Sequence, residues 1–156
     1  MTGDTVSRAD IRAELASEFA DALVGQDLPY QAIFTHDVRG FKGQMPSLLI
    51  LSEGSQRPRF GIGTDKYKPT FRFTLLTFVA DADPEQNWTE ENVEDALDAC
   101  EKALADCVID HKSNSGYWQD AYLDGTAFSE IQNVTMLDGN RYKMERTRLI
   151  VETHDA

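Results

Sequence analysis

The chain has 156 residues, of which 41% are hydrophobic and 27% are charged, and its formal net charge is -12. This length accommodates one ordinary domain with one core, and the composition excludes a wholly disordered, collagen-like or coiled-coil chain. A domain this acidic is repelled by phosphate backbones, so direct binding to DNA or RNA is disfavoured.

Membrane insertion and secretion are also disfavoured. The longest strongly apolar stretch, residues 71–80, contains Arg72 and is much shorter than the roughly 20 residues of a membrane-spanning helix. The first 20 residues include four acidic ones and lack the basic start and apolar run of a signal peptide. We expect the protein to stay in the compartment where it is made, or to leave it by lysis.

Residues 7–25 are predicted to form an amphipathic helix. Ser7 followed by Asp10 is typical of a helix start, and Gly25 is a suitable stop. Apolar residues recur at intervals of four, which defines one buried face. These residues are Ile11, Leu15, Phe19 and Leu23.

Strand-like alternation follows over residues 31–38, 47–52 and 70–79. The last segment is the clearest, because apolar residues fill one of its faces and half of the other, as expected inside a sheet. Residues 53–69, rich in glycine and proline, are predicted to form a long hairpin loop. Loops of this length are often functional or disordered, so we expect this one to be mobile in the free subunit and to order on a partner.

A second helix is predicted from Thr89, a good N-cap, followed by Glu90 and Glu91 where the helix dipole favours negative charge. It is expected to end at residues 113–116. Its apolar seam packs on a sheet and consists of Val93, Leu97, Cys100, Leu104, and Cys107 or Val108. The two cysteines lie about 10 Å apart along such a helix, too far for a disulfide, and are expected to be small core residues.

The C-terminal third is predicted to return to strands, at residues 117–123, 131–137 and 141–152, with a hairpin turn at 138–140. The whole chain, 1–156, is therefore expected to be one α+β domain with residues 1–6 flexible. Its predicted architecture is a two-layer sandwich in the order α-β-β-β-α-β-β, and the weak segment 131–137 is left open as a third strand after the second helix. A mixed or antiparallel sheet of four to five strands is packed by two main helices.

No motif of catalysis or metal binding is recognisable. His36, His111 and His154 are widely spaced, and no close cysteine pair completes a zinc site. The sequence Gly-Ile-Gly at 61–63 lacks a Walker lysine and a following helix, and Asp-Ala-Asp at 81–83 departs from a calcium loop. We predict no catalytic residue, no cofactor and no metal.

Charge is unevenly distributed along the chain. Residues 39–72 contain seven basic residues against two acidic ones, whereas residues 81–110 contain eleven acidic residues against one lysine. Opposite charges of this kind suit contacts between neighbouring identical subunits, although charge alone favours the simpler interpretation of a solvated acidic helix and a basic loop. The predicted interface residues are Arg57, Arg59, Lys66 and Lys68 on one subunit and Glu94 and Asp98 on the next.

Several local patterns, taken with the order of elements, resemble the tail-terminator or tail-completion proteins of tailed bacteriophages and prophages. The matching features are the helix 7–25, Met-Pro-Ser-Leu-Leu-Ile at 45–50, Ser-Glu-Gly-Ser at 52–55 with Arg57 beyond it, the strand 71–79, Trp-Thr-Glu-Glu-Asn-Val-Glu-Asp-Ala-Leu at 88–97, and Gly-Asn-Arg-Tyr at 139–142. The resemblance covers nearly the whole chain and lies in architecture more than in an invariant motif.

The resemblance implies a structural virion protein without catalytic residues. Such subunits form a ring, usually a hexamer, that caps the finished tail tube and joins it to the head. The implied partners are further copies of the chain, the tail-tube protein and the head-completion or connector proteins. The implied location is the cytoplasm of the bacterial host during assembly, and then the head-proximal end of the tail.

Two alternatives stay open at the level of sequence. One is a related head-tail connector, stopper or neck subunit, which composition does not distinguish from a terminator. The other is a small cytosolic enzyme or ligand-binding domain, which requires a deep pocket with convergent polar groups, for example one lined by His36 or Asp37.

Overall fold

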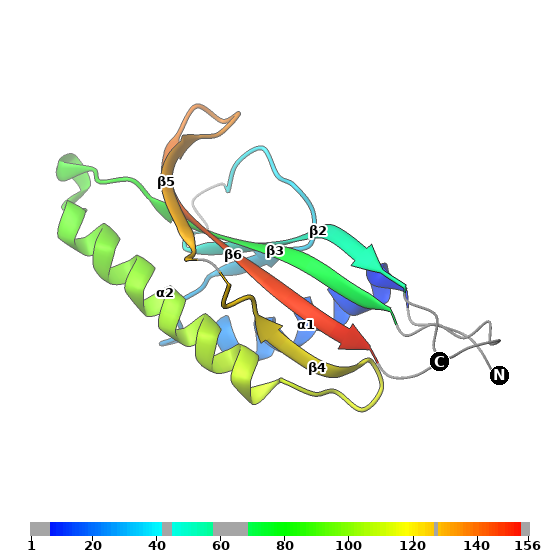
Figure 1. The fold of residues 1–156 in the computed structure, drawn as a ribbon. Coiled ribbons are helices and arrows are strands. Elements are labelled where there is room, and N and C mark those ends of the chain that lie inside the picture. The colour runs from blue at the N-terminus through cyan, green and yellow to red at the C-terminus, as the bar shows by residue number, and fades with distance from the viewer. Residues whose placement is uncertain (1–6, 42–44, 58–68, 127, 154–156) are drawn as a thin grey trace, which may run out of the picture.

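The fold is a curled sheet with two helices on one side, in a computed structural model (Figure 1) that describes residues 7–41, 45–57, 69–126 and 128–153. Residues 1–6 and most of the predicted loop at 53–69 lie outside these ranges. The helices are α1 (Arg8–Leu23), the short 3-10 helix η1 (Pro84–Gln86) and α2 (Glu90–Asp110). The strands are β1 (Ala32–Phe34), β2 (Ser47–Gln56), β3 (Thr70–Ala80), β4 (Trp118–Leu123), β5 (Glu130–Thr135) and β6 (Arg141–Thr153).

The sheet is mixed and has the order β1-β2-β3-β6-β4, with β5 also paired to β6. Only β1 and β2 run parallel; the other pairs are antiparallel. The long strand β6 holds β5 along residues 141–146 and β4 along residues 149–153. These two strands therefore lie end to end along the same edge of β6. The connection between them runs beside residues 147–148 of β6.

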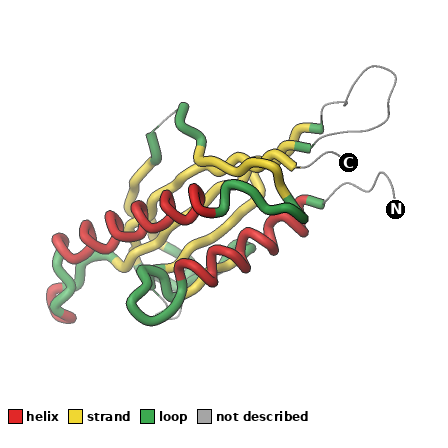
Figure 2. The backbone as a smooth tube through the Cα atoms, turned by 90° about the horizontal axis from the view of Figure 1, so that it is seen from below, coloured by secondary structure: helices red, strands yellow, loops and turns green. Residues whose placement is uncertain are grey.

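Both helices cover the same face of the sheet, as Figure 2 shows from below. The hydroxyl of Ser7 accepts a hydrogen bond from the Asp10 amide, which starts α1, and Thr89 and Asn92 form a reciprocal capping box that starts α2. Each helix turns its apolar stripe onto the sheet. The core residues from the strands are Leu48, Ile50, Phe71, Phe73, Leu75, Trp118, Leu149 and Val151.

The opposite face has its own, smaller apolar cluster at one end. After β1 the chain folds back over the sheet, where Phe41 is buried with its ring centroid 4.8 Å from that of Phe78 and 5.2 Å from that of Tyr142. Leu49 and Met144 complete the buried part of this cluster. No helix of the described residues lies over the other half of this face.

The predicted fold class is confirmed: the chain is α+β, with one sheet packed by two main helices. The buried faces of both helices and the buried cysteines are also as predicted. The sheet has six strands, one more than the four to five predicted, because the weak segment at 131–137 does form a strand, β5, and gives three strands after α2. The second helix ends at Asp110, a few residues before its predicted end.

Two strand boundaries were wrong for identifiable reasons. The first strand is only Ala32–Phe34, because the chain leaves the sheet edge to cover the opposite face. Strand β2 extends to Gln56, so residues 53–56 belong to the sheet and not to the predicted loop. A bulge between Ser52 and Gly54 lets the pairing with β3 continue, and the Glu53 carboxylate accepts a hydrogen bond from Thr74.

Candidate interaction surfaces

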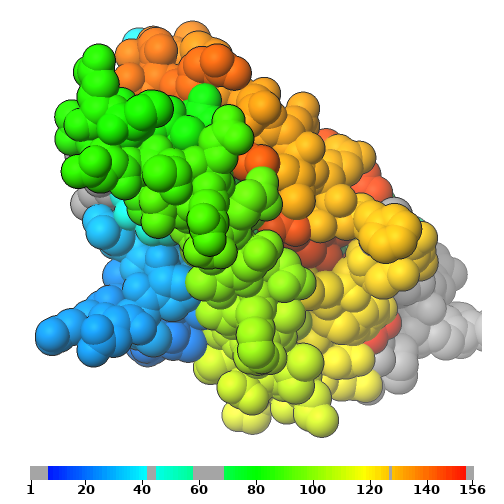
Figure 3. All heavy atoms as spheres, turned by 90° about the vertical axis from the view of Figure 1, so that its left-hand side faces the viewer, coloured from blue at the N-terminus to red at the C-terminus, as the bar shows by residue number. Residues whose placement is uncertain are grey.

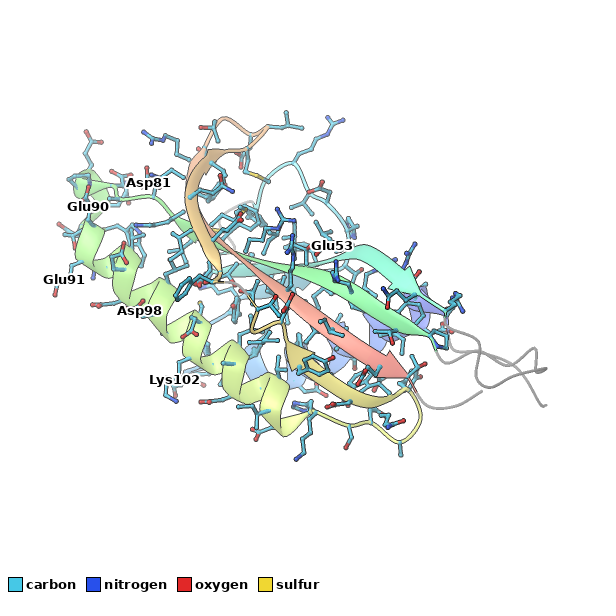
Figure 4. The ribbon with its side chains drawn as sticks, in the orientation of Figure 1. Glu53, Asp81, Glu90, Glu91, Asp98 and Lys102 are labelled. Atoms are coloured by element: carbon cyan, nitrogen blue, oxygen red, sulfur yellow. The ribbon has the colours of Figure 1, made fainter. Side chains whose placement is uncertain are left out.

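The outer surface of α2 is strongly acidic. Eleven of its residues are exposed, and eight of these are carboxylates: Glu90, Glu91, Glu94, Asp95, Asp98, Glu101, Asp106 and Asp110, with Ala99, Lys102 and Ile109 as the others. Figure 3 shows α2 running across one side of the molecule, and Figure 4 shows Glu90, Glu91 and Asp98 projecting from it into solvent. This surface faces away from the sheet, so its charge is available to another molecule.

Two of these carboxylates are already paired within the chain. Glu94 forms an ion pair with Lys143 of β6, and Asp106 lies 2.9 Å from the Lys102 ammonium one turn away. Asp95 and Asp98 have no such cation among the described residues. Of the two α2 residues predicted for the interface, Asp98 is therefore the more available one.

The uncovered half of the opposite sheet face carries three arginines. Arg72 lies on β3, and Arg146 and Arg148 alternate along β6 on the side away from the helices. Arg148 is 3.1 Å from the Glu53 carboxylate, which the bulge in β2 brings over the sheet. We call Arg72, Arg146 and Arg148 the arginine face.

Exposed apolar side chains gather beside the arginine face. Phe128, in the connection between β4 and β5, is 98% exposed. Tyr122 of β4 is also exposed, and it pairs with Ile150 on the same face of the sheet as Arg72. Phe128, Arg146 and Arg148 line one hollow of about 60 Å³. That volume suits the end of one side chain better than a small molecule. An aromatic residue between arginines is a common composition for a protein interface.

The other predicted interface residues are only partly placed. Arg57 follows β2, is exposed, and has its guanidinium carbon 5.5 Å from the centroid of the Phe71 ring. Arg59, Lys66 and Lys68 lie outside the described residues. Arg57 stands beyond the end of β2, whereas Glu94 and Asp98 are on α2 at the other side of the fold (Figure 1), so a contact between them requires two copies.

Arginines 146 and 148 were not among the predicted interface residues. A signal for them was present, because they occupy alternate positions of the last predicted strand, where the period of two puts them on one face. Their common face with Arg72 depends on the pairing of β3 with β6, which the sequence does not specify.

A hollow of about 650 Å³ lies between β1 and the β5–β6 turn, and it includes His36 and Asp37. Its polar groups do not converge on a ligand position. His36, Asp37 and Arg39 are exposed, and the Asp138 carboxylate accepts hydrogen bonds from the Tyr142 hydroxyl and the Asn140 amide. Both hydrogen bonds lower the pKa of Asp138, and the bond from the Asn140 amide has the larger effect.

Buried ionisable groups lie on the helix-covered side. Burial raises the pKa of Glu145, whose carboxylate accepts a hydrogen bond from Ser129 and faces Asp98 and Glu101 of α2. Burial also raises the pKa of Cys100 and of Cys107 to about 12, so neither thiol is a ready nucleophile. Within the described ranges, no three His, Cys, Asp or Glu side chains are arranged to hold a metal ion.

Comparisons with known proteins assign no family. No protein-family model matches the sequence, and no curated protein matches it. Among the described residues, neither helix has the length and apolarity needed to cross a bilayer.

Proposed function

We propose that this chain is a structural subunit of a phage or prophage tail, a tail terminator that assembles into a ring on the end of the tail tube. The ring, a hexamer by the resemblance, provides the surface that joins the tail to the head. Its partners are further copies of the chain, the tail-tube protein and a head-completion or connector protein. The proposal assigns the chain no catalytic step and no cofactor.

One observation carries the proposal: the acidic α2 surface and the arginine face lie on opposite sides of one sheet. Two different surfaces of opposite charge favour a head-to-tail contact, because each copy offers one surface to each neighbour. Such contacts form a closed ring when the rotation between neighbours divides a full turn. A twofold dimer instead requires one self-complementary patch.

The related role of connector, stopper or neck subunit rests on the same surfaces, since these proteins also form rings. The position of the gene separates the two, because a terminator gene is expected beside the tail-tube gene. The hollow at His36 and Asp37 is the observation that favours a ligand-binding role instead. Its exposed polar groups and the occupied Asp138 carboxylate make it the weaker candidate.

The proposal is tested with tail tubes assembled from the tube protein encoded beside this gene. Adding the purified chain is expected to stop elongation, and electron microscopy should show a ring at one end of each tube. Tubes that keep growing with bare ends would contradict the terminator role. Rings that bind isolated head connectors but not tubes would favour the connector role.

A further inference from the structure

We propose that the arginine face of one copy receives the outer surface of α2 from the next copy, with Phe128 as the apolar anchor. This inference deepens the proposed function and rests on it, because it names the contact that repeats around the ring. It involves only surfaces described above.

Two of the three guanidinium groups of the arginine face are not paired with a carboxylate of the described residues. Neither Arg72 nor Arg146 forms an ion pair with another described residue. The nearby carboxylates of Asp124 and Glu130 form no ion pair with these arginines, and Asp124 accepts hydrogen bonds from the Thr126 amide and hydroxyl. The guanidinium groups therefore keep donors free for carboxylates of another copy.

The α2 surface supplies matching carboxylates. Asp95 and Asp98 are three residues apart, so they lie side by side on the helix. Both are exposed, and neither has a cation partner in the described part of the chain. A pair of carboxylates one turn apart suits guanidinium groups presented by the neighbouring strands β3 and β6.

Apolar groups lie within both charged surfaces. Phe128 projects from the edge beside the arginines, and Ile109 is 65% exposed at the C-terminal end of α2, between Asp106 and Asp110. A fully exposed phenylalanine is unusual on a surface that stays in contact with solvent. Aromatic and arginine residues contribute much of the binding free energy in many protein interfaces. We therefore expect Phe128 to be covered by α2 of the neighbour.

The experiment uses two charge-reversed variants of the full chain. Variant one carries Arg72→Glu and Arg146→Glu, which leave the Arg148–Glu53 pair intact. Variant two carries Asp95→Lys and Asp98→Lys. A control with Arg8→Glu and Lys112→Glu makes the same change of net charge as variant one, at exposed positions that flank the two helices. Thermal unfolding checks that each variant is folded.

Each variant alone is expected to lose ring formation by light scattering and negative-stain imaging, whereas the control keeps it. A one-to-one mixture of the two variants should restore rings, since every contact then joins opposite charges and the subunits alternate. Separately, Phe128→Ser should shift the midpoint concentration of assembly upward by at least tenfold without lowering the unfolding temperature.

Where variant one does not fold, the milder pair Arg72→Gln and Arg146→Gln replaces it, together with a salt series on the unmodified rings, which should dissociate as salt rises. Rings from either variant alone, or no rings from the mixture, would overturn the proposed contact while leaving the terminator role intact. An unmodified chain that forms no rings on tubes would instead remove the proposed function itself.

Discussion

The two faces of the sheet are built differently. On the helix-covered face, Phe71, Phe73 and Leu75 are fully buried beneath α1 and α2. On the opposite face, only the end beneath Phe41 is closed, and the rest presents arginines and half-buried apolar residues. Burial on the helix-covered face explains why the chain folds. The open half of the opposite face is not buried by folding and remains accessible for contacts.

This difference would let one domain combine a stable core with a surface for the proposed assembly. The burial of large apolar side chains on one face supplies the hydrophobic free energy for folding. The uncovered half of the other face is then free to evolve for contacts. We expect substitutions on the two faces to have separable effects, and the following predictions test that separation.

The largest loss of stability is expected for Phe73→Ala. Phe73 is fully buried between the sheet and the helices, so its truncation leaves a cavity that a rigid core does not fill. Such changes cost about 3–5 kcal/mol of unfolding free energy. Urea denaturation followed by circular dichroism measures it; a cost under about 1 kcal/mol would mean that this face is not the main core.

A smaller loss, about 2–3 kcal/mol, is expected for Phe41→Ala. Phe41 is also buried, but it belongs to a chain segment that can settle onto Phe78 and Tyr142 when its ring is removed. Amide exchange should quicken at residues 35–41 and stay slow in β3. If Phe41→Ala cost as much as Phe73→Ala, the two faces would be equally important for folding.

Removing the helix cap by Thr89→Ala is expected to cost about 1 kcal/mol. The Thr89 hydroxyl oxygen accepts a hydrogen bond from the Asn92 backbone amide, and the Asn92 side-chain oxygen accepts one from the Thr89 backbone amide. The same denaturation assay measures the effect. The neighbouring exposed substitution Glu91→Ala serves as the control, and it should change stability by much less.

The smallest effect is expected for Glu145→Gln, and it depends on pH. Burial raises the pKa of Glu145, so its contribution to stability is present at low pH and is lost as the pH rises through the folded-state pKa. The neutral glutamine avoids that loss and still accepts the Ser129 hydrogen bond. The variant should therefore unfold at a higher temperature than the parent at neutral pH.

Below the ordinary glutamate pKa, that advantage should vanish, because Glu145 is then protonated in both folded and unfolded chains. Glu130→Gln is the matched control, since Glu130 is exposed on the adjacent strand. An advantage that stayed constant across pH would show that repacking, and not charge, accounts for the result.

Local patterns in the sequence were sufficient to predict both helices, their buried stripes and the interior strand β3, because apolar periodicity and caps act over short distances. The end of β2 was missed, since Glu53 in a bulge has no apolar signature and depends on Thr74 and Arg148 from other strands. The fold-back of Phe41 was missed because it depends on contacts with Phe78 of β3 and Tyr142 of β6, which are distant in the sequence. The arginine face also required knowledge of which strands pair.

Sedimentation velocity over a wide range of concentrations tests most directly whether this chain is a ring-forming subunit. We expect a monomer or weak oligomer in dilute solution and one closed species of fixed mass at high concentration, which dissociates as salt rises. A stable dimer at every concentration, unaffected by salt, would contradict it.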